Sequence, residues 1–421
     1  MSRAQKITLL VALYLAQGLP FGFFTIALPA MLRQSGLSLK AVSAVSLLTL
    51  PWVLKFLWAS YVDRRGTRRG WLLTLQLSAV AVAAAMTQLN LDSGWAPLFA
   101  AAFVFNLIAA TQDIVTDGLA VRMLTTRDLG LGNAIQVGAY RVGMILGGGV
   151  LLQVFAQAGW TTTFVCMTVL LAATIVPVLT LREPPREPVA ERPTTAQLSI
   201  GWLQRLLTPG ILLLAVLIFC YRFGDQLLTT LLVPFLIDNG LDLSAIALIK
   251  GKIGNATSIA GALLGGWLAF STGRRNALLI SGVAQAASFT LYVAAALGAG
   301  GISLLWVATI VEGIIGTMAT VALFTLMMDA SDPEYAGTDY TLLACIVLVV
   351  GMIANFCGAA IADAFGYAAA FTTGAVLALL GCLALIWVLD RKPISARVAA
   401  AWRTGSARPP ATPSRTSATE Y

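Results

Sequence analysis

The sequence contains no histidine among its 421 residues, which excludes histidine proton relays, histidine metal sites and haem ligation by histidine. Charged residues are also scarce. They make up 11% of the chain, against roughly a quarter in an ordinary soluble domain. A soluble globule of this length needs a charged surface, and this chain has too few charges to make one. These shortages exclude a cytosolic enzyme, a disordered protein and a nucleic-acid-binding protein.

Cysteine is rare, and its arrangement indicates no site. All five cysteines lie in apolar runs without CxxC spacing, so neither a disulfide framework nor a zinc site is expected. Apolar residues, in contrast, make up 58% of the chain. A composition this rich in apolar side chains is typical of a protein whose surroundings are lipid.

Long apolar runs divide the sequence into about twelve candidate membrane spans, since a spanning helix needs about 20 mainly apolar residues. The first run is too long for a cleaved signal peptide and is followed by further spans. The sequence therefore predicts an all-α polytopic membrane protein. The runs cover residues 8–32, 41–61, 72–90, 96–122, 133–155, 161–181, 210–236, 244–270, 277–297, 302–328, 338–362 and 367–389.

The basic residues are distributed unevenly over the loops. With the N-terminus inside the cell, about 20 of them fall in inner loops and tails, whereas the outer loops carry only Arg33 and Lys40. Cytoplasmic loops are the ones enriched in Lys and Arg. We therefore predict that both termini are cytoplasmic, and we assign the net charge of +8 to this topology instead of a polyanionic partner.

The polar, proline-rich segment 182–209 separates six predicted spans from the other six. We expect an N-terminal bundle over 1–181, a cytoplasmic linker over 182–209 and a C-terminal bundle over 210–389. The remaining segment, 390–421, is basic and then rich in Ser, Thr, Pro and Ala, which predicts a disordered cytoplasmic tail.

The two halves resemble each other. Residues 35–42 (SGLSLKAV) match residues 239–246 (NGLDLSAI), and 66–69 (GTRR) is echoed by 272–275 (TGRR). A duplicated six-helix bundle with both termini inside is the architecture of major facilitator transporters, whose substrate site lies between the halves. The basic loop 63–69 also resembles the signature between the second and third helices of that superfamily. The resemblance implies a gating role for Asp63, Arg64 and Arg68.

Several ionisable residues fall inside the predicted spans, where each costs a few kcal/mol unless it has a partner or water. In the N-terminal half, Lys55, Asp113, Asp117 and Arg141 fall at similar depth, and the two aspartates are one helical turn apart. These four predict a neutral, paired cluster. It is either a static network that holds the bundle together or a site where one carboxylate exchanges a proton.

In the C-terminal half, Arg222 and Asp225 are three residues apart and can pair along one helix. Gly224 weakens the helix between them, as in the broken helices of many transporter sites; the alternative is an ion pair that neutralises itself. Glu312 is the clearest lone carboxylate, either a proton carrier or a protonated group bonded to a neighbouring helix. No phosphate-binding loop for ATP is present, so we expect transport driven by a gradient. We expect proton coupling at Asp113, Asp117, Asp225 or Glu312, because these are the acidic residues well inside the predicted spans and the sequence has no histidine.

Five short motifs resemble those of AmpG-type permeases, a branch that includes muropeptide importers, acetyl-CoA carriers and the RhtX/FptX-type siderophore importers. The resemblance covers the first eight predicted spans and thins afterwards. It implies a monomeric importer in the bacterial inner membrane, driven by protons, with a small-molecule substrate and no cofactor. The motifs are QGLP at 17–20, LKFLW at 54–58, QDI at 112–114 with Asp117, YRVGM at 140–144 and YRFGD at 221–225.

Two departures favour the siderophore importers within this branch. The chain ends after the twelfth predicted span, and residues 311–313 read Val-Glu-Gly, where muropeptide permeases tend to have an aromatic residue before Glu and Asn after it. We expect import of a siderophore or iron-siderophore by alternating access. A muropeptide permease is the alternative. A membrane enzyme or lipid flippase is a second alternative, although no clustered nucleophile or metal triad is readable and we do not expect an enzyme.

Two arginines are the predicted contacts for an anionic substrate group. Guanidinium groups bind carboxylate and phenolate oxygens in forked geometry and stay charged in a membrane, which singles out Arg141 and Arg222. The other predicted substrate contacts are Tyr14, Gln17, Gln112, Tyr140 and Tyr221.

Overall fold

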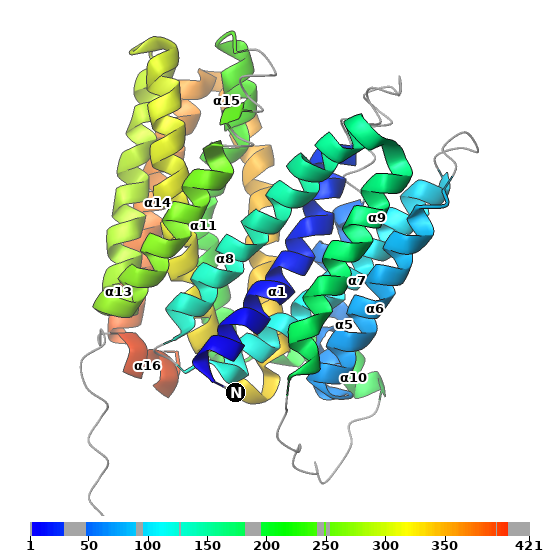
Figure 1. The fold of residues 1–421 in the computed structure, drawn as a ribbon. Coiled ribbons are helices and arrows are strands. Elements are labelled where there is room, and N and C mark those ends of the chain that lie inside the picture. Colours follow the sequence, from blue (N-terminus) through cyan, green and yellow to red (C-terminus); the bar gives the residue numbers. More distant parts are fainter. Residues whose placement is uncertain are drawn as a thin grey trace, which may run out of the picture.

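The computed structural model describes residues 2–28, 48–89, 96–125, 128–181, 195–241, 248–249, 253–392 and 394–402, and every regular element in these ranges is a helix (Figure 1). Helices suit this composition because backbone groups in lipid must be hydrogen-bonded within the segment. Several segments of the sequence lie outside the described residues. They are the repeated residues 35–42, the two lysines at 250 and 252 in the predicted span 244–270, the proline-rich start of the predicted linker and the end of the tail.

The N-terminal half is built from long helices. α1 ends in a π-helical turn, as α8 does, and α4 and α5 together replace one longer helix. The elements are α1 (Arg3–Gly22) with η1 (Phe23–Ala27), α4 (Leu50–Leu54), α5 (Phe56–Arg64), α6 (Arg68–Met86), α7 (Ala96–Met123), α8 (Leu129–Ile145) with η4 (Leu146–Val150), and α9 (Leu151–Leu179).

The C-terminal half follows a short helix that falls within the predicted linker. That helix, α10, lies beside α5, and a last short helix, α16, lies beside α13 and α14. The elements are α10 (Thr195–Leu206), α11 (Pro209–Asp238), α13 (Gly254–Ala296), α14 (Gly301–Ala330), η6 (Pro333–Tyr335), α15 (Ala336–Arg391) and α16 (Ala396–Trp402).

Three of the long helices are each broken at one glycine. Gly159 in α9, Gly273 in α13 and Gly366 in α15 have φ of 78°, 82° and 83°, a region that other residues adopt only with strain. Each glycine falls between two predicted spans. The described residues contain 8 helices long and apolar enough to cross a membrane. When these are divided at the three glycines and α4–α5 is added, they reproduce the roughly twelve spans expected from the sequence.

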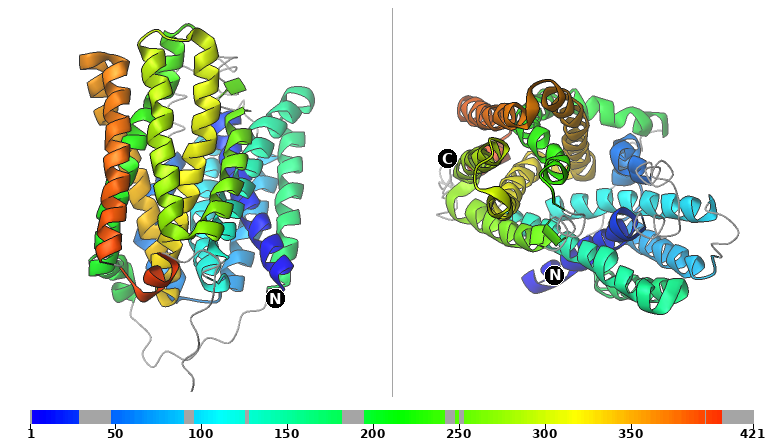
Figure 2. Two further views of the ribbon diagram at one scale, coloured as in Figure 1. Left: turned by 90° about the vertical axis from the view of Figure 1, so that its left-hand side faces the viewer. Right: turned by 90° about the horizontal axis from the view of Figure 1, so that it is seen from above.

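The helices form two bundles that follow the two halves of the chain, with the blue-to-teal helices beside the green-to-orange ones (Figure 2). Across the boundary, α8 packs on α13 and α7 packs on α15. One apolar cluster joins the bundles by bringing Leu10 and Val121 against Leu326 and Leu343. We call the end of the molecule where α1 begins and α10 and α16 lie the basal end (Figure 1).

Within the N-terminal bundle, α1 and α8 approach each other through glycines. A Cβ added at Gly143 would lie 2.6 Å from the carbonyl oxygen of Leu15 and 2.8 Å from the amide nitrogen of Leu19. Only a residue without a side chain fits so close to another backbone. Gly143 thus serves the packing of α8 against α1.

Gly143→Ala is therefore expected to force α1 and α8 apart and to destabilise the protein by about 1–3 kcal/mol. The matched control is Gly138→Ala on the same helix, because a Cβ there meets nothing within 4 Å. The measurement is the melting temperature and the monodisperse yield of detergent-purified protein. Equal values for the two variants would contradict the packing argument.

Candidate functional site

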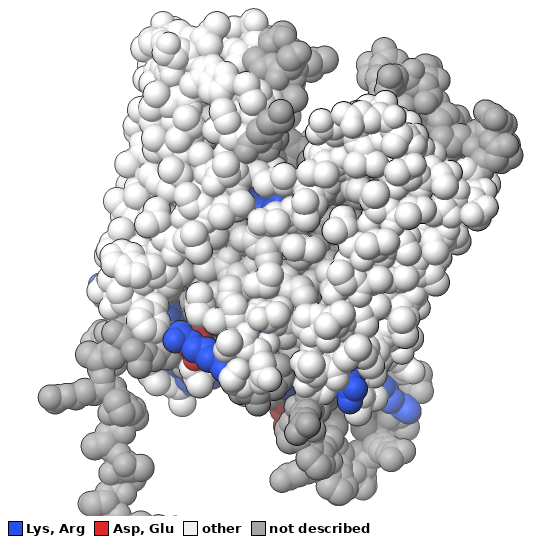
Figure 3. Space-filling model, viewed as in Figure 1, with Lys and Arg blue, Asp and Glu red and all other residues white. Residues whose placement is uncertain are grey.

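A cavity of about 260 Å³ lies between the two bundles, where α8 faces α11, α13 and α14. Charged and amide groups line it: Arg141 from the N-terminal bundle, and Arg222, Asp225, Asn255 and Glu312 from the C-terminal bundle. The space-filling view shows the bundles parting at the end away from the basal end, with Lys or Arg atoms visible between them (Figure 3). Hydroxyl groups complete the lining and come from Thr229, Ser258, Thr309, Thr317 and Thr320.

The predicted pair on α11 forms. Arg222 Nη1 lies 2.7 Å from Asp225 Oδ2 and also donates a hydrogen bond of 3.1 Å to the hydroxyl of Thr320. Asp225 Oδ1 accepts a 2.5 Å hydrogen bond from Gln285 Nε2 on α13. The aspartate is therefore held by two groups, one on its own helix and one on a neighbouring helix.

The predicted weakening of α11 at Gly224 is wrong. The helix is continuous over Pro209–Asp238. Gly224 instead lets α15 approach closely, since an added Cβ would lie 2.8 Å from the carbonyl carbon of Leu377. In this helix the glycine serves packing, and the pair at Arg222 and Asp225 sits on regular helical backbone.

Arg141 crosses from one bundle to the other. Its Nη1 donates to Asn255 Oδ1 on α13 at 3.3 Å and contacts the sulfur of Met144 at 3.8 Å. Among the described residues, no carboxylate oxygen lies within 4.0 Å of its guanidinium, although Glu312 lines the same cavity. The arginine thus has donors left for an anionic ligand.

Part of the predicted four-residue cluster forms inside the N-terminal bundle. Lys55 and Asp113 are buried and make an ion pair. Asp117 Oδ1 accepts hydrogen bonds from the hydroxyl of Tyr14 at 2.9 Å and from Gln136 Nε2 at 3.0 Å. The inclusion of Arg141 is wrong, because that side chain reaches the cavity instead.

The other predicted substrate contacts are not among the residues that line the cavity between the bundles. Gln17 donates to the hydroxyl of Thr116 at 3.1 Å inside the N-terminal bundle. Tyr140 packs against Phe21, with ring centroids 5.6 Å apart, and Tyr221 is buried. Tyr14, Gln17, Gln112 and Tyr221 are buried, so a substrate reaches these four only if the helices move, whereas Tyr140 is half-buried.

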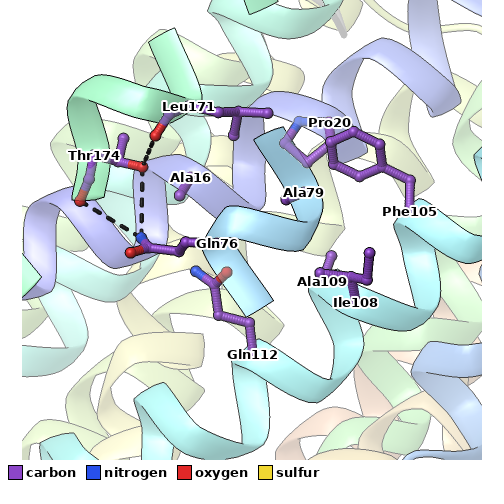
Figure 4. Close-up of a pocket in the computed structure, with 10 residues that line it drawn as sticks. All are labelled: Ala16, Pro20, Gln76, Ala79, Phe105, Ile108, Ala109, Gln112, Leu171 and Thr174. Carbon is purple, nitrogen blue, oxygen red and sulfur yellow. Dashed lines mark hydrogen bonds between the residues drawn. The ribbon is translucent and has the colours of Figure 1, made fainter. Parts of the chain in front are cut away.

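Gln112 points into a separate, small cavity of the N-terminal bundle (Figure 4). Its volume of about 10 Å³ is close to the least that holds one water molecule. Gln76, drawn beside Gln112 in Figure 4, donates long hydrogen bonds of 3.5 Å to Thr174. This cavity is too small for a substrate.

The residues predicted to act as a gate meet at the basal end, where α5 joins α15. Asp63 forms an ion pair with Arg68, and its Oδ2 accepts hydrogen bonds from the amide and hydroxyl of Thr338 at 3.1 and 3.2 Å. Arg64 lies 3.7 Å from the carboxylate of Glu334. These contacts tie the two bundles together at this end.

The linker helix makes a second contact that ties the bundles at the basal end, and this contact was not predicted from the sequence. Arg205 of α10 donates two hydrogen bonds to Asp339 of α15, at 2.7 and 2.6 Å. These bonds raise the pKa of the Arg205 guanidinium above its ordinary value. Trp202 of the same helix packs edge-on against Phe56 of α5 at 4.9 Å. The linker helix therefore touches both bundles.

Several polar residues of the site were also not predicted from the sequence. Asn255, Gln285 and Thr320 hold the two arginines and Asp225. The one available signal is that each is polar within an apolar span, where a polar side chain needs a partner. Uncharged groups give this signal weakly, because threonine and asparagine also bond to their own helix.

Comparison with known proteins identifies relatives over most of the chain. The family model described as Major Facilitator Superfamily matches residues 10–354 and 214–417. An uncharacterized protein of Haemophilus influenzae is 30% identical over 395 residues, which cover 89% of this chain and 92% of that protein. The anhydromuropeptide permease of Escherichia coli K12 is 29% identical over 393 residues, which cover 90% of this chain and 79% of the permease.

Solved structures share the fold at low sequence identity. The proton:xylose symporter XylE bound to 6-bromo-6-deoxy-D-glucose superposes with a TM-score of 0.70 at 13% identity, covering 93% of this chain and 97% of the symporter. The transporter FucP in its outward conformation superposes with a TM-score of 0.71 at 12% identity, covering 91% and 97%.

Proposed function

The chain belongs to the Major Facilitator Superfamily, and from this membership we propose that it is a proton-coupled permease that imports anhydromuropeptides across the bacterial inner membrane. Such a substrate joins sugar rings to a short peptide, so it carries hydroxyls, amides and carboxylates. Members of this superfamily are multi-pass membrane transporters and generally not enzymes.

One observation carries the proposal: Arg141 lies in the cavity between the bundles with no carboxylate of the described residues within 4.0 Å. A charged guanidinium with spare donors is a binding site for a carboxylate. The hydroxyls around it suit a sugar or a peptide amide. A cavity of about 260 Å³ is smaller than a typical ligand pocket, so we place the carboxylate end of the substrate there and the remainder between the parted bundles (Figure 3).

The relatives favour the muropeptide alternative over the siderophore importer expected from the sequence. The Escherichia coli relative named above is an anhydromuropeptide permease, and proteins of Rickettsia named as putative AmpG transporters are also similar, the Rickettsia felis one at 24% identity over 349 residues. The departures around Glu312 distinguish this chain within the branch but do not outweigh relatives that match nearly its whole length.

The conformation agrees with an importer waiting for substrate. The bundles are tied at the basal end by Asp63 with Thr338 and by Arg205 with Asp339. If the termini are cytoplasmic, as the basic residues predict, the basal end is the inner side and the protein faces outward. Alternating access then requires these ties to open once substrate is bound.

The experiment that tests this function is uptake in a bacterium that lacks its own muropeptide permease. Cells that express this chain are expected to take up labelled anhydromuropeptide, and a protonophore is expected to abolish accumulation. Labelled iron-siderophore is measured in parallel. Siderophore uptake without muropeptide uptake would overturn the proposal and restore the other substrate. Accumulation that ignores the protonophore would remove proton coupling.

A further inference from the structure

A second group of carboxylates lies deep in the N-terminal bundle, away from the cavity. Asp113 and Asp117 occupy successive turns of α7, and Asp117 is only 1% exposed. The titratable and charged groups that face the two carboxylates are Tyr14 of α1, Lys55 beside α5, Tyr140 of α8, and Tyr340 and Cys345 of α15. Four different helices other than α7 therefore enclose them.

The charges of this group do not balance if both carboxylates are ionised. Lys55 forms an ion pair with Asp113, and among the described residues no other cation lies within 4.0 Å of either aspartate. An unpaired charge in a dry interior is costly. One bound proton makes the group neutral, and Asp117, whose Oδ1 accepts from two uncharged donors, is the carboxylate without an ion pair.

A short chain of hydrogen bonds joins Asp117 to the other bundle. Gln136 donates to Asp117 with its Nε2, and its Oε1 accepts a 3.1 Å hydrogen bond from the hydroxyl of Tyr340. Tyr340 follows Asp339 at the start of α15, beside the basal ties, and its ring meets Phe324 edge-on at 6.4 Å. Tyr340, at the far end of this chain of hydrogen bonds, thus belongs to the half that must move away when the basal end opens.

We infer that Asp117 is a proton switch that acts through Gln136 and Tyr340 on the contact between the bundles at the basal end. While that end is closed, Asp117 holds its proton because no water reaches it. When α15 moves away, water enters, the proton passes from the carboxyl group to water and the carboxylate is solvated. Gln136 and Tyr340 are positioning residues in this scheme. The inference rests on the proposed proton-coupled import and states where a proton is held and released.

The consequence for pH follows from linkage. A proton bound only in the closed form stabilises that form at acidic pH. For one linked proton, the equilibrium constant for opening rises by about tenfold per pH unit between the pKa of Asp117 in the open form and its pKa in the closed form. Alkaline pH therefore favours an open basal end. Because this is a property of the protein alone, it is measurable without any substrate.

The experiment is amide hydrogen exchange of the purified full chain, followed in peptides that cover residues 331–343 at several pH values and corrected for the intrinsic rate. We expect exchange in the wild type to rise with pH, and Asp117→Asn, which is permanently neutral, to stay protected throughout. Tyr340→Phe keeps the aromatic ring and loses the hydroxyl, so its protection at acidic pH is expected to fall towards the alkaline level.

The matched control is Asp238→Asn, which neutralises an exposed carboxylate at the end of α11 and is expected to keep the wild-type response to pH. A response that is unchanged in Asp117→Asn, or lost in Asp238→Asn, overturns the inference. If Asp117→Asn yields no folded protein, Tyr340→Phe decides, and a wild-type profile in that variant overturns it too. Failure of muropeptide uptake leaves these exchange results unaffected, so the two proposals fail separately.

Discussion

Arg141→Gln is expected to lower the initial rate of anhydromuropeptide uptake by about a hundredfold, because a lost hydrogen-bonded charge contact costs roughly 1.5–3 kcal/mol. The side chain lines the cavity between the bundles, and among the described residues the oxygen to which it donates a hydrogen bond belongs to the neutral amide of Asn255. Removal of the guanidinium therefore breaks no ion pair with a described carboxylate. The loss should appear in uptake and not in the amount of folded protein.

Two further variants sharpen this experiment. Arg141→Lys keeps the charge and loses the fork of donors, so its uptake is expected to be intermediate. Arg391→Gln is the matched control, because Arg391 is exposed and stacks on the ring of Trp387 at 4.0 Å, away from the cavity. Uptake by Arg141→Gln that equals the control would show that substrate carboxylates bind elsewhere.

The sequence predicted the helices well because lipid imposes a simple rule. A span needs about 20 apolar residues, whatever its neighbours are, so the runs at 96–122 and 302–328 correspond closely to α7 and α14. Contacts along one helix were also predictable. Arg222 and Asp225 are three residues apart, and that spacing places them on one helix face.

Contacts between helices were not predictable in the same way. The position of Arg141 along its helix gave the right depth, but depth does not determine the direction in which the side chain points around the helix axis. Arg141 consequently meets Asn255, 114 positions away, and Tyr340 meets Gln136, 204 positions away. Such partners depend on how the bundles pack, and the spacing of residues along one helix does not predict that packing.

The linker shows a third limit of prediction from the sequence. Its proline-rich start indicates an extended connection, yet the following residues form α10, which packs against α5 and binds α15. A helix of 12 residues is marginal alone in water and is stabilised by tertiary contacts. The alternation of apolar and polar residues in 195–206 is the one local signal for it, and composition averaged over the segment concealed that signal.

Arg205→Ala is expected to destabilise the closed basal end by about 3 kcal/mol, the lower end of the cost of removing one partner from a buried ion pair, because Asp339 is buried whereas Arg205 is partly exposed. Asp339 is fully buried and accepts both hydrogen bonds of the guanidinium, so the variant leaves a buried carboxylate without its cation. The melting temperature of the purified protein should fall by several degrees. Exchange in residues 331–343 should rise, because α10 no longer holds the start of α15.

The matched control for this variant is Arg275→Ala, which removes a pair of similar geometry. Arg275 Nε lies 2.9 Å from Asp390 Oδ1, but both side chains are partly exposed, and such pairs contribute only about 0–1 kcal/mol. A second test combines Arg205→Ala with Asp339→Asn, which removes the unpaired charge and is expected to restore part of the lost stability. If Arg205→Ala and Arg275→Ala melt at the same temperature, α10 does not hold the bundles together, and the contacts of Asp63 and Arg64 close the basal end without it.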